Sequence, residues 1–248
     1  MRVSCLWYNY EQMKPTNKAG FTIIETILFL GITGALIVGV LVGAGTSINA
    51  QRYRDSVSSL RSFLQQQYSE VLNVSNDTTD SACEGISLVN HGQSRCVILG
   101  RYITGNSNSL TSKMVIGATD ETVSLPSDDI AALNLYDITV SNTITDDDKY
   151  DVEWGSLLNT VDGNPMSFTI LILRSPTSGV IRTFIDDTAI RSDIRNLIKS
   201  TSPALNTSAT ICVNSNGLFT GDKMAVSIEK NATSADGIDS KGGANGCH

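Results

Sequence analysis

One long apolar stretch lies near the N-terminus, and shorter apolar patterns follow it along the chain. After Glu25 no charged residue appears until Arg52. The apolar sequence from Phe21 to Gly45, about 25 residues, predicts a helix of roughly 37 Å, enough to cross a hydrocarbon core of about 30 Å. A single segment in lipid must satisfy its own backbone hydrogen bonds, so we expect helix although isoleucine and valine are abundant in it.

The helical pattern continues beyond this apolar stretch. Apolar residues spaced by three or four fall on one face: Ala50, Tyr53, Val57, Leu60, Leu64, Tyr68 and Val71. Charged and amide side chains such as Arg52, Asp55 and Gln65 fall mostly on the rest of the surface. We therefore expect one helix over residues 21–75 whose second half packs on a globular part, and the polar residues from Asn73 onward end it.

Downstream of residue 76 the pattern is mainly that of short strands. Strands are predicted at 96–103, 114–117, 135–144, 149–154, 210–213 and 224–228. The clearest hairpin joins 166–174 to 179–185, because Ser175-Pro176-Thr177-Ser178 between them is a turn-forming sequence.

Two further downstream segments carry helical patterns. Residues 127–133 predict a helical turn, and residues 188–200 alternate apolar and charged positions as an amphipathic helix does. The polar, glycine-rich tail at 231–246 is expected to be loose unless a crosslink holds it. The expected fold class is α+β: a long N-terminal helix, membrane-spanning in its first half, packs through its second half on a mainly antiparallel β-sheet.

Glu25 is the anomaly in the apolar stretch. A carboxylate inside a membrane span costs on the order of 3 kcal/mol even on lenient insertion scales, so such an acid is by default a functional residue with a partner to be found. Small residues recur every four positions along the same stretch, at Gly31, Ala35, Gly39 and Gly43. Such a row permits a second helix to approach closely, so the stretch suits a bundle of subunits.

The residues around this acid resemble a known family. Gly20-Phe21-Thr22-Ile23-Ile24-Glu25 is similar to the processing signal of type IV pilins and pseudopilins. In that family a short basic leader ends in glycine, a phenylalanine becomes the new N-terminus and a glutamate follows four residues on. Gly34 falls where the family usually keeps a glycine, and the resemblance covers residues 14–50.

The resemblance implies three segments: a cleaved leader at 1–20, a transmembrane and amphipathic helix at 21–75, and an exported pilin-like head at 76–248. It implies that prepilin peptidase cleaves between Gly20 and Phe21 and that Phe21 is then N-methylated. It also implies partners, which are an inner-membrane assembly platform and the other pilin subunits of a helical filament.

The implied assembly gives the buried acid its partner. The new α-amino group of Phe21 in one subunit is a cation that can neutralise Glu25 of a neighbour inside the apolar bundle. Before assembly the protein is expected in cytoplasmic membrane lipid as a single-pass protein with its N-terminus in the cytoplasm. Afterwards it is expected in an extracellular pilus or an envelope-spanning pseudopilus.

Three functional hypotheses follow. Removal of 20 residues from 248 leaves a mature chain of 228, which is long for a major pilin and favours a minor one, with its head exposed for adhesion, surface contact or DNA uptake. The alternatives are a pseudopilin of a type II secretion system and a membrane-anchored exported domain that does not polymerise. Glu25 and the cleavage junction argue against the last, because a mere anchor needs neither; the sequence does not separate the first two or predict what the head binds.

Composition excludes other classes. The net charge of −7 argues against nucleic-acid binding as the main activity, because an acidic surface repels phosphate. Enzymatic activity and cofactors are not expected: Gly-x-Ser-x-Gly is absent, and only His91 and the terminal His248 offer an imidazole base.

The densest acidic cluster comprises Asp146, Asp147, Asp148, Asp151 and Glu153. It lacks the glycine and spacing of an EF-hand loop, so a solvated loop is the favoured interpretation and a calcium site the alternative.

The cysteines predict disulfides. Cleavage of the leader would discard Cys5 and leave four in a compartment where disulfides persist. Three connectivities are possible, and closeness in sequence favours Cys83 with Cys96 and Cys212 with Cys247. A zinc site is not predicted, because no Cys-x-x-Cys occurs and the histidines are not at zinc-finger spacing.

Overall fold

The computed structural model describes residues 20–73, 96–119, 124, 126–141, 148–199, 202–217, 219–243 and 247. The chain divides into two compact units, Met1–Gly45 and Thr46–His248. The first contains the apolar beginning of a long helix. The second contains the rest of that helix and antiparallel sheets, so the fold class is α+β as predicted.

Helix α1 (Ile23–Leu72) is 50 residues long, close to the extent that the periodicity predicts. Within the second unit its buried residues follow the predicted apolar face, with two polar additions: Tyr53, Ser56, Val57, Leu60, Leu64, Gln67, Tyr68 and Val71. Full burial of one aliphatic side chain stabilises a fold by about 1.5–3 kcal/mol, so this face fixes the second half of α1 to the strands.

The larger sheet is antiparallel and has six strands. They are β1 (Cys96–Gly105), β2 (Ser109–Ala118), β3 (Asp137–Val140), β4 (Asp148–Asp151), β6 (Phe168–Arg174) and β7 (Ile181–Asp186). The order is β3-β2-β1-β6-β7, and β4 pairs with β2 at Ser109–Ser112, whereas β3 pairs with it at Val115–Ala118. The predicted hairpin of β6 and β7 is confirmed, with its turn closed by Gly179 N donating to Ser175 O at 3.0 Å.

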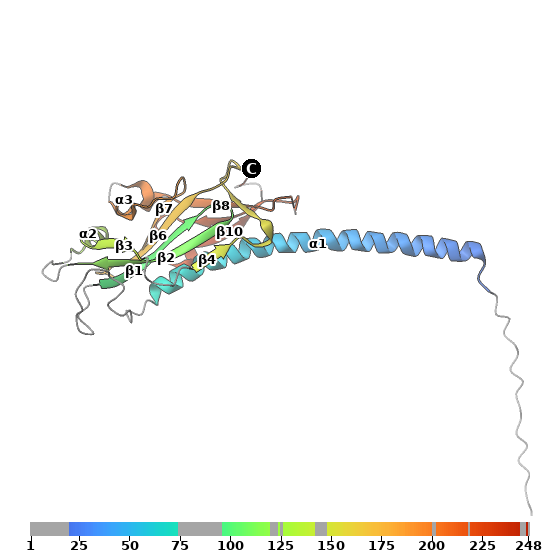
Figure 1. Cartoon of the computed structure of the whole chain (residues 1–248), viewed down its shortest axis with the longest axis horizontal. Coiled ribbons are helices and arrows are strands. Elements are labelled where there is room, and N and C mark those ends of the chain that lie inside the picture. Colours follow the sequence, from blue (N-terminus) through green and yellow to red (C-terminus); the bar gives the residue numbers. More distant parts are fainter. Residues whose placement is uncertain are drawn as a thin grey trace, which may run out of the picture. The chain divides into compact units, whose positions relative to one another are not determined.

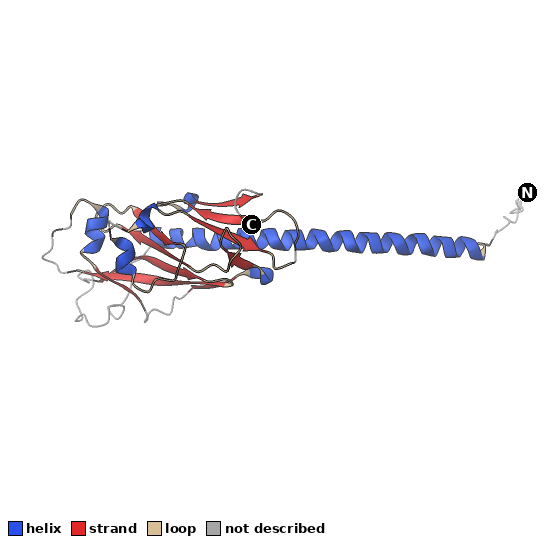
Figure 2. Ribbon diagram, turned by 90° about the horizontal axis from the view of Figure 1, so that it is seen from above, coloured by secondary structure: helices blue, strands red, loops and turns tan. Residues whose placement is uncertain are grey.

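The smaller sheet has four antiparallel strands in the order β10-β9-β8-β5. They are β5 (Leu157–Asn159), β8 (Ala209–Asn214), β9 (Met224–Ile228) and β10 (Ile238–Gly242). Figure 2 shows the strands of the second unit lying across the second half of α1.

Short helices complete the second unit. They are α2 (Asp129–Asn134), α3 (Ile194–Ile198), and the 3-10 turns η2 (Glu153–Gly155), η3 (Pro203–Asn206) and η4 (Ala235–Gly237). In Figure 1, α2 and α3 lie on the side of the larger sheet opposite to α1. The sheet is therefore covered on both faces.

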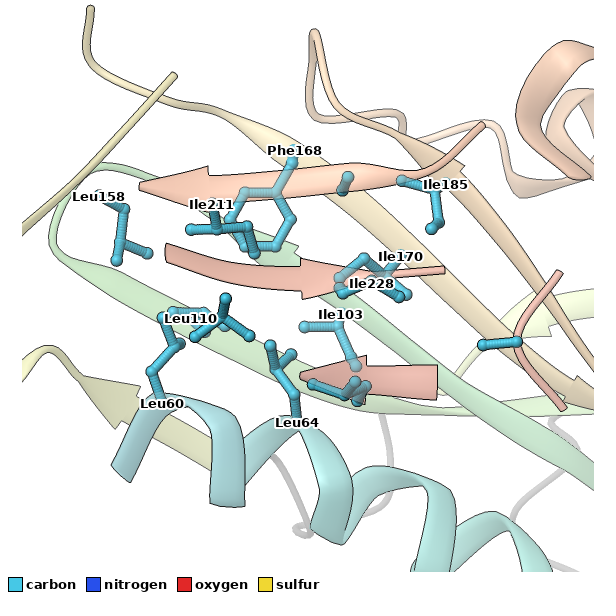
Figure 3. Close-up of a cluster of buried hydrophobic side chains, with 14 of the residues drawn as sticks. Leu60, Leu64, Ile103, Leu110, Leu158, Phe168, Ile170, Ile185, Ile211 and Ile228 are labelled. Atoms are coloured by element: carbon cyan, nitrogen blue, oxygen red, sulfur yellow. The ribbon is translucent and has the colours of Figure 1, made fainter. Parts of the chain in front are cut away.

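Strand β6 separates two hydrophobic cores. Phe168, Ile170 and Ile172 point into the core that α1 covers, together with residues of the smaller sheet. Leu171 and Leu173 point the other way, into the core beneath α2 and α3. Figure 3 shows Leu60 and Leu64 of α1 directed at the first of these cores. Alternate residues of one strand thus serve opposite layers.

Two glycines of β1 let β6 approach closely. Gly105 lies opposite Phe168, and a Cβ at Gly105 would collide with the Phe168 ring. Gly100 lies opposite Leu173, and a Cβ there would collide with the carbonyl group of Ile172. Gly100 also ends the register shift between Ile98 and Gly100 in the pairing of β1 with β2, so β1 is irregular on that side at the same residue.

The helix predicted at 188–200 is wrong in extent, because α3 covers only Ile194–Ile198. Asp186 Oδ1 accepts hydrogen bonds from Thr188 N at 3.0 Å and from Thr188 Oγ1 at 2.6 Å. A carboxylate that binds the backbone two residues on competes with helix formation, so the chain turns here. Ile190 is left 50% exposed instead of packing as part of an amphipathic face.

Other predicted boundaries also shift. The strand predicted at 149–154 ends as β4 at Asp151, and the 3-10 turn η2 follows it. The strand predicted at 135–144 is described as β3 over Asp137–Val140, and part of its predicted extent lies outside the described residues. The tail at 231–246 was expected to be loose unless a crosslink held it; the Cys212–Cys247 disulfide is present, and η4 and β10 form within the tail. Strand β5 was not predicted at all.

Candidate functional site

The candidate site begins at the start of α1. Gly20 and Phe21 precede the helix, and the Phe21 side chain is 80% exposed. Thr22 caps the helix: its Oγ1 accepts a hydrogen bond from Glu25 N at 3.4 Å, and its carbonyl accepts from Thr26 N at 3.1 Å. The sequence analysis missed this role of Thr22, although threonine three residues before glutamate is the spacing of a capping box.

The first half of α1 is apolar on all sides. It is long and apolar enough to cross a membrane, and none of its most apolar window is buried inside the chain. Large side chains around its circumference are more than half exposed, including Ile24 at 75%, Phe29 at 66% and Leu41 at 66%. A core helix of a soluble protein would bury such residues, so this segment requires lipid or other helices as its surroundings.

Hydroxyl groups in this segment are satisfied by its own backbone. Thr26 Oγ1 donates to Ile23 O at 2.9 Å, and Thr33 Oγ1 donates to Phe29 O at 2.8 Å. This back-bonding is how a helix carries threonine in a medium without water.

Glu25 differs from these threonines. It lies in the first turn, where a negative charge is favourable to the helix dipole. Its side chain is exposed, and within the described part of the chain no hydrogen bond or ion pair is found for the carboxylate. A carboxylate in an apolar segment for which the described residues provide no partner is the unusual feature of this helix.

Three glycines of this segment have open space around them in the described part of the chain. A Cβ at Gly31, Gly34 or Gly39 would meet no atom within 4 Å, in contrast to Gly100 and Gly105 of the sheet. Glycine in a helix interior costs about 1 kcal/mol relative to alanine. The small surface that these residues provide is therefore available to a neighbouring helix.

The second half of α1 is tied to the strands by buried polar contacts. Tyr53 Oη donates to Val213 O at 2.7 Å and accepts from Met224 N at 2.6 Å. Ser112 Oγ donates to Gln67 Oε1, with both side chains buried. These contacts hold the helix at a single rotation and height against both sheets.

Tyr68 adds a short relay of hydrogen bonds. Thr183 Oγ1 donates to Ala232 O at 2.6 Å, so Tyr68 Oη is the donor in its 2.8 Å contact with Thr183 Oγ1. Burial raises the pKa of Tyr68 to about 12, against a smaller lowering by the Thr183 hydrogen bond. The tyrosine therefore stays neutral and keeps its proton for this contact.

The cysteines are placed as follows. Cys212 and Cys247 form a disulfide with 5.7 Å between their Cα atoms, which is one of the two predicted pairs. It fastens the C-terminal end of the chain to β8. Cys83 lies outside the described residues, as does the side chain of Cys96, so the second predicted pair stays a prediction.

The acidic cluster is described only in part, because Asp146 and Asp147 lie outside the described residues. Asp148 Oδ2 lies 3.7 Å from Arg101 Nη1, and Glu153 Oε1 accepts a hydrogen bond from Ser59 Oγ at 3.0 Å. Within the described ranges no group of three or more acidic, histidine or cysteine side chains is arranged to hold a metal ion. Asp148 and Glu153 thus contact β1 and α1, respectively.

Comparison of the chain with protein-family models, with curated proteins and with solved structures finds no match.

Proposed function

We propose that this chain is a pilin-like structural subunit, a minor subunit of a type IV pilus, which joins a helical filament through the first half of α1. Prepilin peptidase would release Phe21 as the N-terminus, and the head would face outward for adhesion, surface contact or DNA uptake. The observation that carries the proposal is Glu25, a carboxylate in an apolar helix for which the described residues provide no partner.

A neighbouring subunit offers the missing partner. After cleavage, the α-amino group of Phe21 is a cation at the start of an otherwise uncharged helix, and it would lie within the same apolar bundle as Glu25 of the next subunit. A buried charge is tolerated when it is paired, and the cost of leaving it unpaired is high. Gly31, Gly34 and Gly39 support the same arrangement, because the space beside them is open among the described residues and allows close helix approach.

The experiment compares assembly of wild type with E25A, E25Q and T26A in a strain that holds the processing peptidase and the filament machinery. The E25A variant should insert into the membrane at least as well as wild type, because a charge is removed from lipid. It should be scarce in sheared filaments, since the neighbouring ammonium loses its counter-ion at a cost of roughly 3 to 5 kcal/mol.

The E25Q variant should be intermediate, because it keeps a hydrogen-bond acceptor without the charge. T26A is the matched control: among the described residues the Thr26 hydroxyl donates to the backbone carbonyls of Thr22 and Ile23, so its loss should leave assembly unchanged. Equal amounts of E25A and wild type in filaments would refute the role of Glu25. A wild-type chain that never enters filaments would favour a membrane-anchored domain.

A further inference from the structure

The loop after β4 holds Trp154 outward in an unusual backbone conformation. Its φ is 57°, in the left-handed region that bulky side chains rarely adopt, and Gly155 follows at 69°. Val152 and Ser156 on either side are buried, whereas Trp154 is 49% exposed. Such strain persists only where the surroundings over-determine it, and it concentrates at functional positions. The exposed indole therefore suggests a contact outside the chain.

Arg52 of α1 gives the position of this indole along the helix. The Arg52 guanidinium carbon lies 4.9 Å from the centre of the Trp154 ring, which is a cation–π contact. Residues 26–51 carry no charge, so Arg52 is the first charged residue after Glu25. A helix of that length spans roughly 39 Å, which a tilt of about 20° reduces to roughly 37 Å along the bilayer normal. This equals a hydrocarbon core of about 30 Å and one headgroup layer of about 7 Å. A span with Glu25 just inside one edge of the hydrocarbon core therefore brings Arg52 to the phosphate layer on the other side.

The carboxylate of Glu153, the residue before Trp154, is held further along α1 than the Arg52–Trp154 contact. Glu153 accepts its hydrogen bond from Ser59, seven residues beyond Arg52 and roughly 10 Å further along the helix. The Trp154 indole therefore lies beside Arg52, next to the uncharged segment, whereas the Glu153 carboxylate is held further along α1. This order suits a phosphate-rich layer, because it keeps the carboxylate of the loop away from the phosphates. The exposed carboxylate of Asp55 lies about one turn beyond Arg52 and is adjacent to Arg54.

We propose that Trp154 and Arg52 form a membrane-interface anchor, which lies in the phosphate and glycerol layer of the bilayer that α1 crosses. Tryptophan is enriched at that depth because its ring is apolar and its N–H is polar, and arginine reaches phosphate from there. The inference rests on the membrane-borne subunit of the proposed function. It adds that the head is held at a fixed height on the lipid before assembly.

The chain has two tryptophans, Trp7 and Trp154, so a W7F variant of the full chain reports on Trp154 alone. It is reconstituted into phosphatidylethanolamine and phosphatidylglycerol vesicles whose acyl chains carry bromine, a quencher, either close to the glycerol backbone or near the bilayer centre. We expect the shallow bromine to remove most of the Trp154 emission and the deep bromine to remove little.

Two further single-tryptophan chains serve as matched controls. W7F/W154F/L41W places the reporter in the apolar helix, where bromine should quench it strongly. W7F/W154F/L135W places it at the end of α2, on the face of the larger sheet opposite to α1, at a residue that is 44% exposed. That chain should keep its emission in both kinds of vesicle.

The outcomes separate the two proposals. Quenching of L41W without quenching of Trp154 would overturn the anchor and leave the membrane span intact. Absence of quenching in L41W would overturn both. A third outcome is that bromine does not quench the Trp154 emission, which changes only as the ratio of protein to lipid is raised. That result would assign the indole to a contact with a second copy of the chain, which also overturns the anchor.

Discussion

Arg182 binds Asp129 through two nitrogens, Nε at 3.1 Å and Nη2 at 2.7 Å from the carboxylate Oδ2. The other oxygen, Oδ1, accepts hydrogen bonds from Ser178 Oγ at 2.6 Å and Ser175 Oγ at 2.8 Å. The first turn of α2 is thereby fixed to the turn between β6 and β7. The Ser178 hydrogen bond, followed by those of Arg182 and Ser175, lowers the pKa of Asp129 from 3.8 to about 2.

This carboxylate makes stability depend on pH in the acid range. Because its pKa is lower in the folded state, its contribution is fully present above pH 3.8 and is lost as the pH falls through about 2. The loss should amount to about 1 to 2 kcal/mol after allowance for solvent screening, because the Asp129 side chain is still 10% exposed. Urea unfolding of the full chain in mild detergent, measured between about pH 5 and about pH 2, tests the expectation.

The variants for this test are D129N and D162N. D129N should be less stable than wild type near neutral pH and should lose less stability on acidification. D162N changes an exposed carboxylate in the turn after β5 and should follow wild type throughout. Parallel acid profiles of D129N and wild type would contradict the assignment.

Arg101 and Glu70 should be energetically coupled. Arg101 of β1 is 8% exposed, and its Nη2 lies 2.7 Å from Glu70 Oε2 of α1. Removal of one partner leaves a charge in a poorly solvated place, so R101Q and E70Q should each destabilise the fold, whereas the double variant should lose less than their sum. A double-mutant cycle by urea unfolding should give a coupling energy of about 1 to 3 kcal/mol.

The pair of Arg195 and Asp137 is the matched control. Its side chains are 57% and 69% exposed, so the same cycle should give less than about 1 kcal/mol. Coupling energies of equal size in the two cycles would show that burial adds nothing to the Glu70 contact.

The Cys212–Cys247 disulfide should stabilise the head by about 4 kcal/mol in the chain-entropy model, because it closes a loop with a sequence separation of 35 residues. The C212S/C247S variant should unfold at lower urea concentration, and its C-terminal strand β10 should be cut first by protease. C5S is the control, since Cys5 belongs to the predicted leader. Non-reduced peptide maps that show both thiols free in the exported protein would refute the crosslink.

Leader cleavage should leave Phe21 as the N-terminus. In a strain that holds the processing peptidase, mass spectrometry of the membrane fraction should show a chain that lacks the first 20 residues. Its mass should be that of residues 21–248 plus one methyl group. A G20R variant should keep Met1, because a bulky cation at the junction replaces the small residue that the resemblance implies the peptidase needs. A K18R variant, which keeps the leader basic, serves as the conservative control. An intact N-terminus in the wild type would refute the pilin-like proposal.

The elements that the sequence predicts well are those whose own pattern determines them. Helix α1 follows from spacing over many turns, and the β6–β7 hairpin follows from Ser175-Pro176-Thr177-Ser178 between two apolar runs. Strand β10 was missed because only Ile238 in it is buried, so its pairing with β9 and the nearby disulfide decide its conformation.

The candidate site was predictable where a local sequence pattern marks it, and not where it depends on contacts between distant parts of the chain. Glu25 stands out in sequence because charge in an apolar run is visible without a structure. Thr22 was detectable from its spacing to Glu25. The contact of Arg52 with Trp154 was not, because it joins α1 to a loop that only the folding of the sheets brings near, and an αL tryptophan leaves no mark in sequence.

The apolar run of β6 carries no alternation that would tell one face from the other. A slip by one residue would exchange Ile170 and Ile172 for Leu171 and Leu173, side chains of nearly equal volume, with little change in buried surface. What distinguishes the native register is the missing side chain at Gly105, which receives the Phe168 ring, and the one at Gly100, which receives the β6 backbone. The register of β1 against β6 thus depends on the absence of a Cβ at Gly100 and at Gly105. A change from glycine to alanine at either position would disturb the pairing of the two strands more than the packing of the cores.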